Sequence, residues 1–218
     1  GFLVCFMYSS WVWGVGIGLT AGLLIASWLP RRFVGNDGSA FLGEKTLKKT
    51  GLKINLRKAV PGDCKMLLGL LKDLAVAEGE EADLVQVTEK DLHEHHFGPD
   101  SICSTILVEV AGEVVGFALF YYTYSTWQGR TLHLEDLYVK ECWRKNGIGL
   151  LLLGTLAEMS CKKGCARFAW QSLESNTPAN KFYTSLGSKW RKEVRTWKME
   201  EPGQRYLIET ARATLQQT

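Results

Sequence analysis

The sequence lacks the residue patterns of several common kinds of site. Its six cysteines form no CxxC pair and no disulfide-scaffold spacing, so we expect no metal site and reduced thiols. The net charge of +3 is small and dispersed over 218 residues, which argues against nucleic acid as a partner. The cysteine pattern therefore favours a cytosolic domain with reduced thiols.

Charge is also absent from the N-terminal segment. No charged residue occurs in residues 1–30, and Arg31-Arg32 follows at once. About 20 apolar residues are enough for a helix to cross a bilayer, so residues 2–29 predict a single transmembrane anchor. The basic residues after it would place the C-terminal side in the cytosol. The alternative is that residues 1–30 are a gene-model artefact.

The rest of the chain predicts one folded domain at residues 54–200, between a basic linker (31–53) and a C-terminal tail (201–218). Periodicity predicts strands at 54–57, 105–110, 114–124, 131–139 and 168–173, with a weaker strand pair around 190–199. Two helices are expected to begin after Pro61 and after a capping box at Thr88. A third should follow the strand at 131–139 and end at about Lys163, and a fourth should run from an N-cap at Thr177 to about Ser185. An antiparallel meander followed by a βαβ unit predicts an α/β fold with a mixed, mostly antiparallel sheet and helices on both faces.

A glycine turn stands between the strand at 131–139 and the helix after it. The turn runs from Arg144 to Gly149. Backbone N–H groups in such a turn converge on an anion, with the positive end of the helix dipole behind them. Gly147 and Gly149 carry no Cβ atoms that would hold a phosphate away from the backbone. The turn therefore predicts a phosphorylated ligand.

Three classes of phosphate site compete for this turn. A Walker loop requires GxxxxGK[ST], which the sequence does not contain. A Rossmann site requires GxGxxG in the first βαβ unit, whereas this turn comes late, after a meander. The third pattern, [RQ]-x-x-G-x-[GA] between strand and helix, is met by Arg144, Gly147 and Gly149.

With that motif the chain resembles the GNAT acetyltransferases, and among them the diamine acetyltransferases of the spermidine/spermine and thialysine types. The resemblance spans about residues 54–199. It rests on Thr88–Leu92, Phe97-Gly98, Val115–Ala118, Tyr121–Thr131, Leu134–Val139, Gly147–Gly149, Lys163–Cys165 and Phe182-Tyr183. The Ser125–Thr131 run makes the match specific and favours the thialysine type.

The resemblance implies that acetyl-CoA is the co-substrate and that no metal takes part. The strand before the turn would pair with the pantetheine arm, the turn would hold the pyrophosphate, and the next helix start would add contacts. The implied cofactor residues are Leu137, Tyr138, Val139, Arg144, Lys145, Asn146, Gly147, Ile148, Gly149, Leu150, Asn176, Thr177, Pro178 and Ala179.

The resemblance also implies an acceptor site for a small cationic amine. Glu135 would bind the ammonium and act as a base through water, and Tyr183 would protonate the departing thiolate. Asp136 faces the opposite side if the strand is regular, whereas a bulge would bring both carboxylates to the cleft. The implied substrate contacts are Ala77, Glu78, Glu135, Asp136, Ala169, Trp170 and Gln171.

Three positions depart from the family pattern. Ala77 stands where the spermidine enzymes have an aromatic residue, and Ser175 replaces a tryptophan. Residues 184–186 lack the basic side chains that often meet the 3′-phosphate of CoA, for which Lys181 is a substitute.

The resemblance further implies a homodimer with each cleft lined partly by the partner.

Two other functions stay open at this point. One is a protein or peptide N-acetyltransferase, and the other is a membrane-tethered, inactive GNAT-like binding protein. Association with a membrane depends on whether residues 1–30 belong to the mature protein.

His93, His95 and His96 occur together, but without a further ligand at matching spacing we expect a solvated helix end rather than a metal site.

Overall fold

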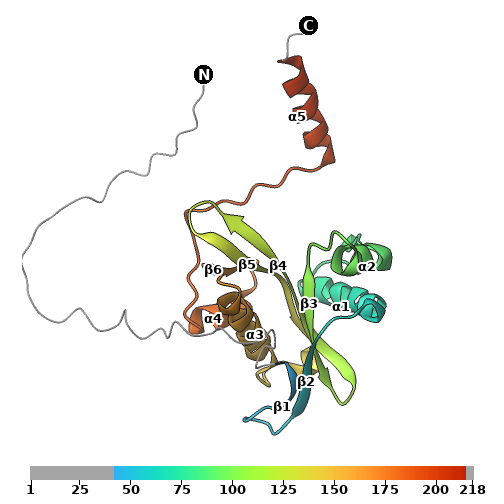
Figure 1. The fold of residues 1–218 in the computed structure, drawn as a ribbon, viewed down its shortest axis with the longest axis vertical. Helices are drawn as coiled ribbons and strands as arrows, with labels where there is room; N and C mark the ends of the chain where they lie inside the picture. Colours follow the sequence, from blue (N-terminus) through green and yellow to red (C-terminus); the bar gives the residue numbers. More distant parts are fainter. Residues whose placement is uncertain (1–41, 215–218) are drawn as a thin grey trace, which may run out of the picture.

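A six-stranded sheet forms the centre of the computed structural model, which describes residues 42–214 (Figure 1). The strands lie side by side in chain order, and all neighbours are antiparallel except the last pair, β5 and β6, which is parallel. The predicted mixed, mostly antiparallel sheet is therefore confirmed. The strands are β1 (Gly43–Thr46), β2 (Lys53–Lys58), β3 (Ser104–Val110), β4 (Glu113–Ser125), β5 (Gly129–Val139) and β6 (Arg167–Trp170).

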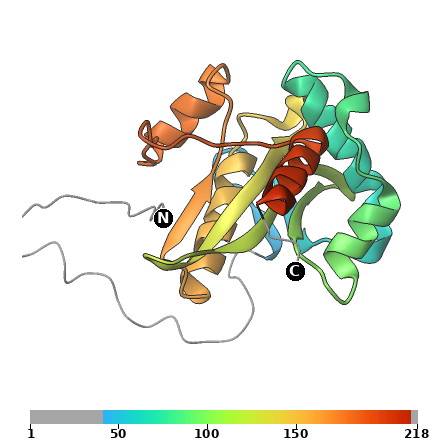
Figure 2. The same cartoon turned by 90° about the horizontal axis from the view of Figure 1, so that it is seen from above.

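Helices cover both faces of this sheet, as expected (Figure 2). Helices α1 (Cys64–Ala77) and α2 (Glu89–Phe97) pack on one face. Helices α3 (Ile148–Lys162) and α4 (Thr177–Ser185) lie on the other. A further helix, α5 (Glu201–Ala213), stands apart from the sheet in Figure 1.

Each face has its own apolar core. The core under α3 joins its buried leucines to side chains from four strands, with Phe182 and Tyr183 of α4 packed at its margin. The core under α1 and α2 joins Leu67, Leu70 and Leu92 to Phe117 and Tyr138, among others. Full burial of one such side chain contributes about 1.5–3 kcal/mol, so these two cores fix the sheet between its helices.

The sheet begins earlier than the sequence predicted. Strand β1 lies inside the segment predicted as a linker at residues 31–53, and it pairs antiparallel with β2. Leu42, Leu47 and Leu52 of that segment pack against the core under α3, and apolar packing explains why it is ordered. The many Gly and Lys residues concealed this pattern. Residues 31–41 lie outside the described part of the chain.

The predicted strand pair around residues 190–199 is wrong. Between Leu186 and Glu200 the structure shows no strand, and β6 ends at Trp170 rather than near residue 173. Trp190 and Trp197 are 73% and 86% exposed. Alternating apolar residues form a strand only where a neighbouring strand accepts their hydrogen bonds, and β6 has none on that side in the described structure. The segment predicted as a tail contains α5.

Two helix starts were predicted from capping patterns. Thr88 caps α2 as expected, because its hydroxyl accepts from the Asp91 amide while the Asp91 carboxylate accepts from the Thr88 amide. At α4 the prediction was one residue late. Asn176, rather than Thr177, is the N-cap, and its Oδ1 accepts from the Ala179 amide at 3.3 Å.

The histidines at the end of α2 are not all solvated, contrary to expectation. His96 is buried, and its ring nitrogens lie 2.9 Å from the Leu92 carbonyl oxygen and 3.0 Å from Thr105 Oγ1. Burial lowers the pKa of His96, so the ring is neutral near pH 7. His96 thus ties α2 to β3. Residues 42–214 contain no cluster of His, Cys, Asp and Glu suited to a metal ion.

The predicted anchor at residues 2–29 lies outside the described residues. Among the helices within residues 42–214, none is both long enough and apolar enough to span a bilayer.

Candidate active site

The central feature of the site is the point at which β5 and β6 separate. Their parallel ladder ends with the pair Leu134 and Trp170, whereas β5 continues to Val139 with β4 as its partner. From Glu135 to Val139, the edge of β5 that faces away from β4 pairs with no other described strand. The main-chain groups of this edge are therefore available to a ligand.

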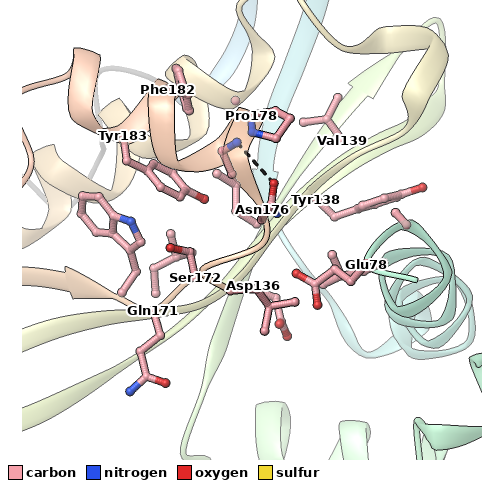
Figure 3. Close-up of a pocket in the computed structure, with 18 of the residues that line it drawn as sticks. Glu78, Asp136, Tyr138, Val139, Gln171, Ser172, Asn176, Pro178, Phe182 and Tyr183 are labelled. Carbon is pink, nitrogen blue, oxygen red and sulfur yellow. Dashed lines mark hydrogen bonds between the residues drawn. The ribbon is translucent and has the colours of Figure 1, made fainter. Parts of the chain in front are cut away.

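A cavity of about 610 Å³ occupies this opening. It lies between the end of α1, the open edge of β5, the loop after β6 and the start of α4 (Figure 3). Most of the predicted site residues line it: Ala77, Glu78, Glu135, Asp136, Leu137, Tyr138, Val139, Arg144, Gly149, Trp170, Gln171, Asn176, Pro178, Ala179 and Tyr183.

A β-bulge determines which side chains of β5 enter the cavity. Leu119 of β4 pairs with Asp136 and Phe120 pairs with Leu134, so Glu135 is an extra residue without an opposite partner. Directly opposed residues in an antiparallel pair point to the same face, so Asp136 shares the face of Leu119, which packs under α1. Both carboxylates line the cavity, which is the outcome expected for a bulge rather than a regular strand.

Glu135 is the more exposed of the two carboxylates, with 51% of its side chain accessible. Its Oε2 accepts a hydrogen bond of 2.8 Å from the Tyr121 hydroxyl and lies 3.7 Å from His133 Nε2. Burial, with a further contribution from Glu135, raises the pKa of Tyr121 to about 12. Tyr121 therefore stays protonated and keeps one oxygen of Glu135 occupied.

Asp136 is partly buried beneath the end of α1. Burial, followed by the negative charges of Glu135 and Glu78, raises the pKa of Asp136 to about 6. Figure 3 shows Glu78 and Asp136 facing the same side of the cavity. Near pH 7 this end of the cavity therefore attracts a cation.

Tyr183 enters the cavity from α4, opposite the carboxylates, with its hydroxyl pointing inward (Figure 3). Its ring packs against the indole of Trp170, with 5.3 Å between ring centroids. Burial raises the pKa of Tyr183, and the charge of Glu78 adds to this effect. The phenol is therefore protonated near pH 7, as a proton donor must be.

The glycine turn leads into α3 and presents the features of an anion site. Gly147 is the N-cap, with φ of 89°, and no side chain caps the helix. The first helix-type bond runs from the Leu151 amide to the Gly147 carbonyl, so the amides before Leu151 have no acceptor within the helix. Left-handed backbone strongly favours glycine at position 147. These groups fit a phosphate.

Arg144 and Gly116 hold the end of β5 in place. Arg144 Nε donates to the Val139 carbonyl oxygen at 2.9 Å, and its guanidinium lies 5.8 Å from the centre of the Tyr138 ring. Gly116 is the partner of Val139 on β4, and a Cβ there would lie 2.7 Å from the Tyr138 carbonyl oxygen. The close approach of β4 thus depends on glycine at this position.

Some predicted site residues do not line the cavity: Lys145, Asn146, Gly147, Ile148, Leu150, Thr177 and Ala169. The Ile148 side chain is buried in the core, so only its main chain is available to a ligand. Thr177 lines a separate shallow hollow together with Lys181. Ala169 precedes Trp170 on β6, where alternation turns its side chain to the other face.

Several residues line the cavity that were not predicted from the sequence as site residues: Leu74, Leu134, Ser172, Leu173, Ser175 and Phe182. Leu74 and Phe182 are apolar residues of helices, and apolar periodicity does not distinguish a side chain of the core from one that lines a cavity. Ser172 and Leu173 directly follow the predicted site residue Gln171. Their position just after β6 was therefore the sequence signal that could have identified them as cavity residues.

Comparison with known proteins identifies relatives for most of the chain. A model of the acetyltransferase (GNAT) family matches residues 68–187. The thialysine N-epsilon-acetyltransferase of Bos taurus is 35% identical over 152 residues, which cover 66% of this chain and 89% of that protein. The enzyme of the same name from Mus musculus is 33% identical over 150 residues, covering 65% and 88%.

Solved structures share the fold. An integron cassette protein of V. cholerae superposes with a TM-score of 0.61 at 25% identity, covering 72% of this chain and 98% of its own. The aminoglycoside N-acetyltransferase AAC(6')-Iy, solved with CoA, superposes with a TM-score of 0.56 at 17% identity, covering 68% and 96%. The second likeness concerns the fold alone.

The raised pKa of Asp136 predicts a stability cost that depends on pH. The folded protein holds the Asp136 proton up to about pH 6, whereas the ordinary value is 3.8. The cost of ionising it therefore develops between about pH 4 and 6 and is complete above pH 6, at an upper limit of roughly 3 kcal/mol. Asp136→Asn should remove this cost and raise the free energy of unfolding at pH 7, measured by urea titration.

The same titration at pH 4.5, 5.5, 6.5 and 7.5 checks the cause. The difference in free energy of unfolding between variant and wild type should grow from pH 4.5 to 6.5 and then level off at pH 7.5. Asp100→Asn, at an exposed position after α2, is the matched control and should leave the pH dependence unchanged. Equal pH slopes for wild type and Asp136→Asn would contradict the prediction.

Proposed function

Because the chain belongs to the GNAT family of acetyltransferases and is an acyltransferase, we propose that it acetylates the primary amine of a small cationic acceptor. Thialysine, diamines and polyamines are the acceptor class. The observation that carries this proposal is the cavity itself, where Glu78, Glu135 and Asp136 face Tyr183 beside the open edge of β5. The relatives named for thialysine acetylation support the same acceptor class.

GNAT acetyltransferases use acetyl-CoA, which supplies an activated thioester. We place its pyrophosphate at the turn amides of residues 145–150, beside Arg144, and its pantetheine arm along the main chain of Leu137 to Val139. Two observations support this: the uncapped start of α3 and the open edge of β5. Residues 176–179 would add contacts at the start of α4, and Lys181 is positioned in the adjoining hollow.

The acceptor is proposed to bind at the acidic end of the cavity. Glu78 and the two carboxylates of β5 would hold its ammonium group, since opposite charges attract strongly where water is partly excluded. Ala77, Trp170 and Gln171 would form the walls, with the main chain of Ala169 nearby. The small side chain of Ala77 leaves the wall beside Glu78 without an aromatic group.

The reaction requires the acceptor to lose a proton before it can attack. An alkylammonium has a pKa near 10.4, so only about one molecule in a thousand is a free amine at pH 7.4, which costs roughly 4 kcal/mol. In our proposal a carboxylate of β5 accepts that proton, and the amine attacks the thioester directly in a ternary complex. The Tyr183 hydroxyl then protonates the departing sulfur.

Release of CoA from acetyl-CoA tests this proposal against its rivals. The purified chain would be assayed with thialysine, spermidine, and a panel of peptides with free α-amino or lysine groups. We expect turnover with the small cations. Turnover with peptides alone would favour a protein N-acetyltransferase, and no turnover with any amine would favour a binding protein.

Tyr183→Phe tests the proposed proton donor. The ring and its packing on Trp170 remain, while the hydroxyl that points into the cavity is lost. Turnover should fall by about 10²–10³-fold, the usual contribution of general acid catalysis. The KM for acetyl-CoA should change little. Unchanged turnover would remove Tyr183 from the reaction, and Tyr124→Phe, at an exposed position of β4, is the control.

We also propose that the protein is a homodimer, as the family resemblance implies. The segment from Trp190 to α5 supports this, because Trp190, Trp197 and Tyr206 are more than 70% exposed. Exposed aromatic groups in one segment are typical of an interaction surface. Sedimentation velocity should give a mass of about twice 24.4 kDa; a monomer at micromolar concentration would contradict the proposal.

A further inference from the structure

The bulge in β5 presents two adjacent carboxylates to one cavity in different surroundings. We infer that Asp136 accepts the proton that the acceptor ammonium loses, while Glu135 helps to hold the acceptor. This inference rests on the proposed function. It reverses the expectation from the family resemblance, which gave the role of base to Glu135.

The carboxylate oxygens of Glu135 and Asp136 differ in their availability to an acceptor. Tyr121 donates to Glu135 Oε2 at 2.8 Å, so that carboxylate already has a fixed partner outside the reaction. Within residues 42–214, no side chain donates a hydrogen bond to the Asp136 carboxylate, and no Lys, Arg or His lies within 4.0 Å of it. Asp136 therefore lacks the cation that its surroundings favour, and an acceptor ammonium would supply it.

Glu135 and Asp136 also differ in their position in the cavity. Asp136 pairs with Leu119 across the ladder, which places it on the face of the sheet covered by α1. Glu135 is 51% exposed, whereas Asp136 is partly buried in the cavity with Glu78 facing it (Figure 3). A base works best when burial brings its basicity close to the working pH.

The charges around Asp136 are consistent with this role. Glu135 is its neighbour on β5, Glu78 faces it from the end of α1, and the protonated phenol of Tyr183 faces it from α4. Burial, followed by the two glutamates, raises the pKa of Asp136 to about 6. The group is thus ionised at pH 7, and it holds a proton more readily than an ordinary aspartate.

The proton balance of the reaction is complete with these groups. An N–H bond of the ammonium breaks, and its proton joins Asp136 directly or through one water. The nitrogen lone pair forms a bond to the thioester carbonyl carbon, and the carbon–sulfur bond breaks with its electron pair moving to sulfur. Sulfur takes the Tyr183 proton, and the second proton lost by nitrogen restores Tyr183 through water. Asp136 releases its proton to solvent, leaving the acetylated amine, CoA and one proton.

The test compares Asp136→Asn with Glu135→Gln over pH 5.5–9.5, with thialysine and spermidine as acceptors. Wild-type kcat/KM for the amine should rise to a plateau with an apparent pKa near 6, because Asp136 must be ionised. Asp136→Asn should lose about 10²–10³-fold at pH 7 and recover about tenfold per pH unit, since it depends on amine already neutral in solution. Glu135→Gln should raise the KM for the amine and keep the plateau.

The opposite pattern would overturn the inference: a plateau in Asp136→Asn and a tenfold rise per pH unit in Glu135→Gln. Asp100→Asn is the control for loss of one exposed acidic charge and should match wild type. Thermal melts check folding, and Asp136→Ser replaces Asp136→Asn if that variant is unfolded. Wild-type protein that turns over no amine would reject the proposed function itself, whereas an active wild type with the opposite pattern rejects only the role of Asp136.

Discussion

The separation of β5 from β6 after the Leu134–Trp170 pair is the constraint on which the site depends. Up to that pair, both strands satisfy each other's main-chain groups. Beyond it, β5 keeps β4 on one side and leaves its other edge to the cavity. The two strands stay apart because the cores on both faces of the sheet fix β5 and α4 on opposite sides of the opening.

The same opening explains why binding and chemistry meet in one place. The connection after β5 leads through the glycine turn into α3, so the uncapped helix start lies at the end of the exposed edge. The bulge at Glu135 stands at the other end, where it turns two consecutive side chains toward α1. Under the proposed function, a ligand that spans both features would be extended, with its anionic part at the turn and its reacting part between the carboxylates and Tyr183.

Local sequence could predict the elements whose signals are local. Glycine, capping residues and apolar alternation act within a few positions of the chain. They therefore allowed prediction of the turn at Arg144–Gly149, the capping box at Thr88 and the long strands. The register of β5 against β4 was not, since a bulge depends on the partner strand. For the same reason β1 was not recognised in a Lys- and Gly-rich segment, and a strand was expected near Trp197, where residues 42–214 provide no partner strand. His96 was misread because its burial depends on Thr105 of another element.

The acidic end of the cavity works against the stability of the empty protein. Burial and mutual repulsion both disfavour charge on Asp136, and neither Arg nor Lys in the described residues offsets it. Elsewhere the fold does pair its partly buried acids, as Arg57 shows with Asp63 and Glu109. Asp136 has no such partner within the described residues, which supports our proposal that the compensating cation is the acceptor. Under the proposed function, a cationic acceptor would satisfy that condition and a neutral one would not. The negative charge that helps to raise the pKa of Asp136 would then also favour a cationic substrate.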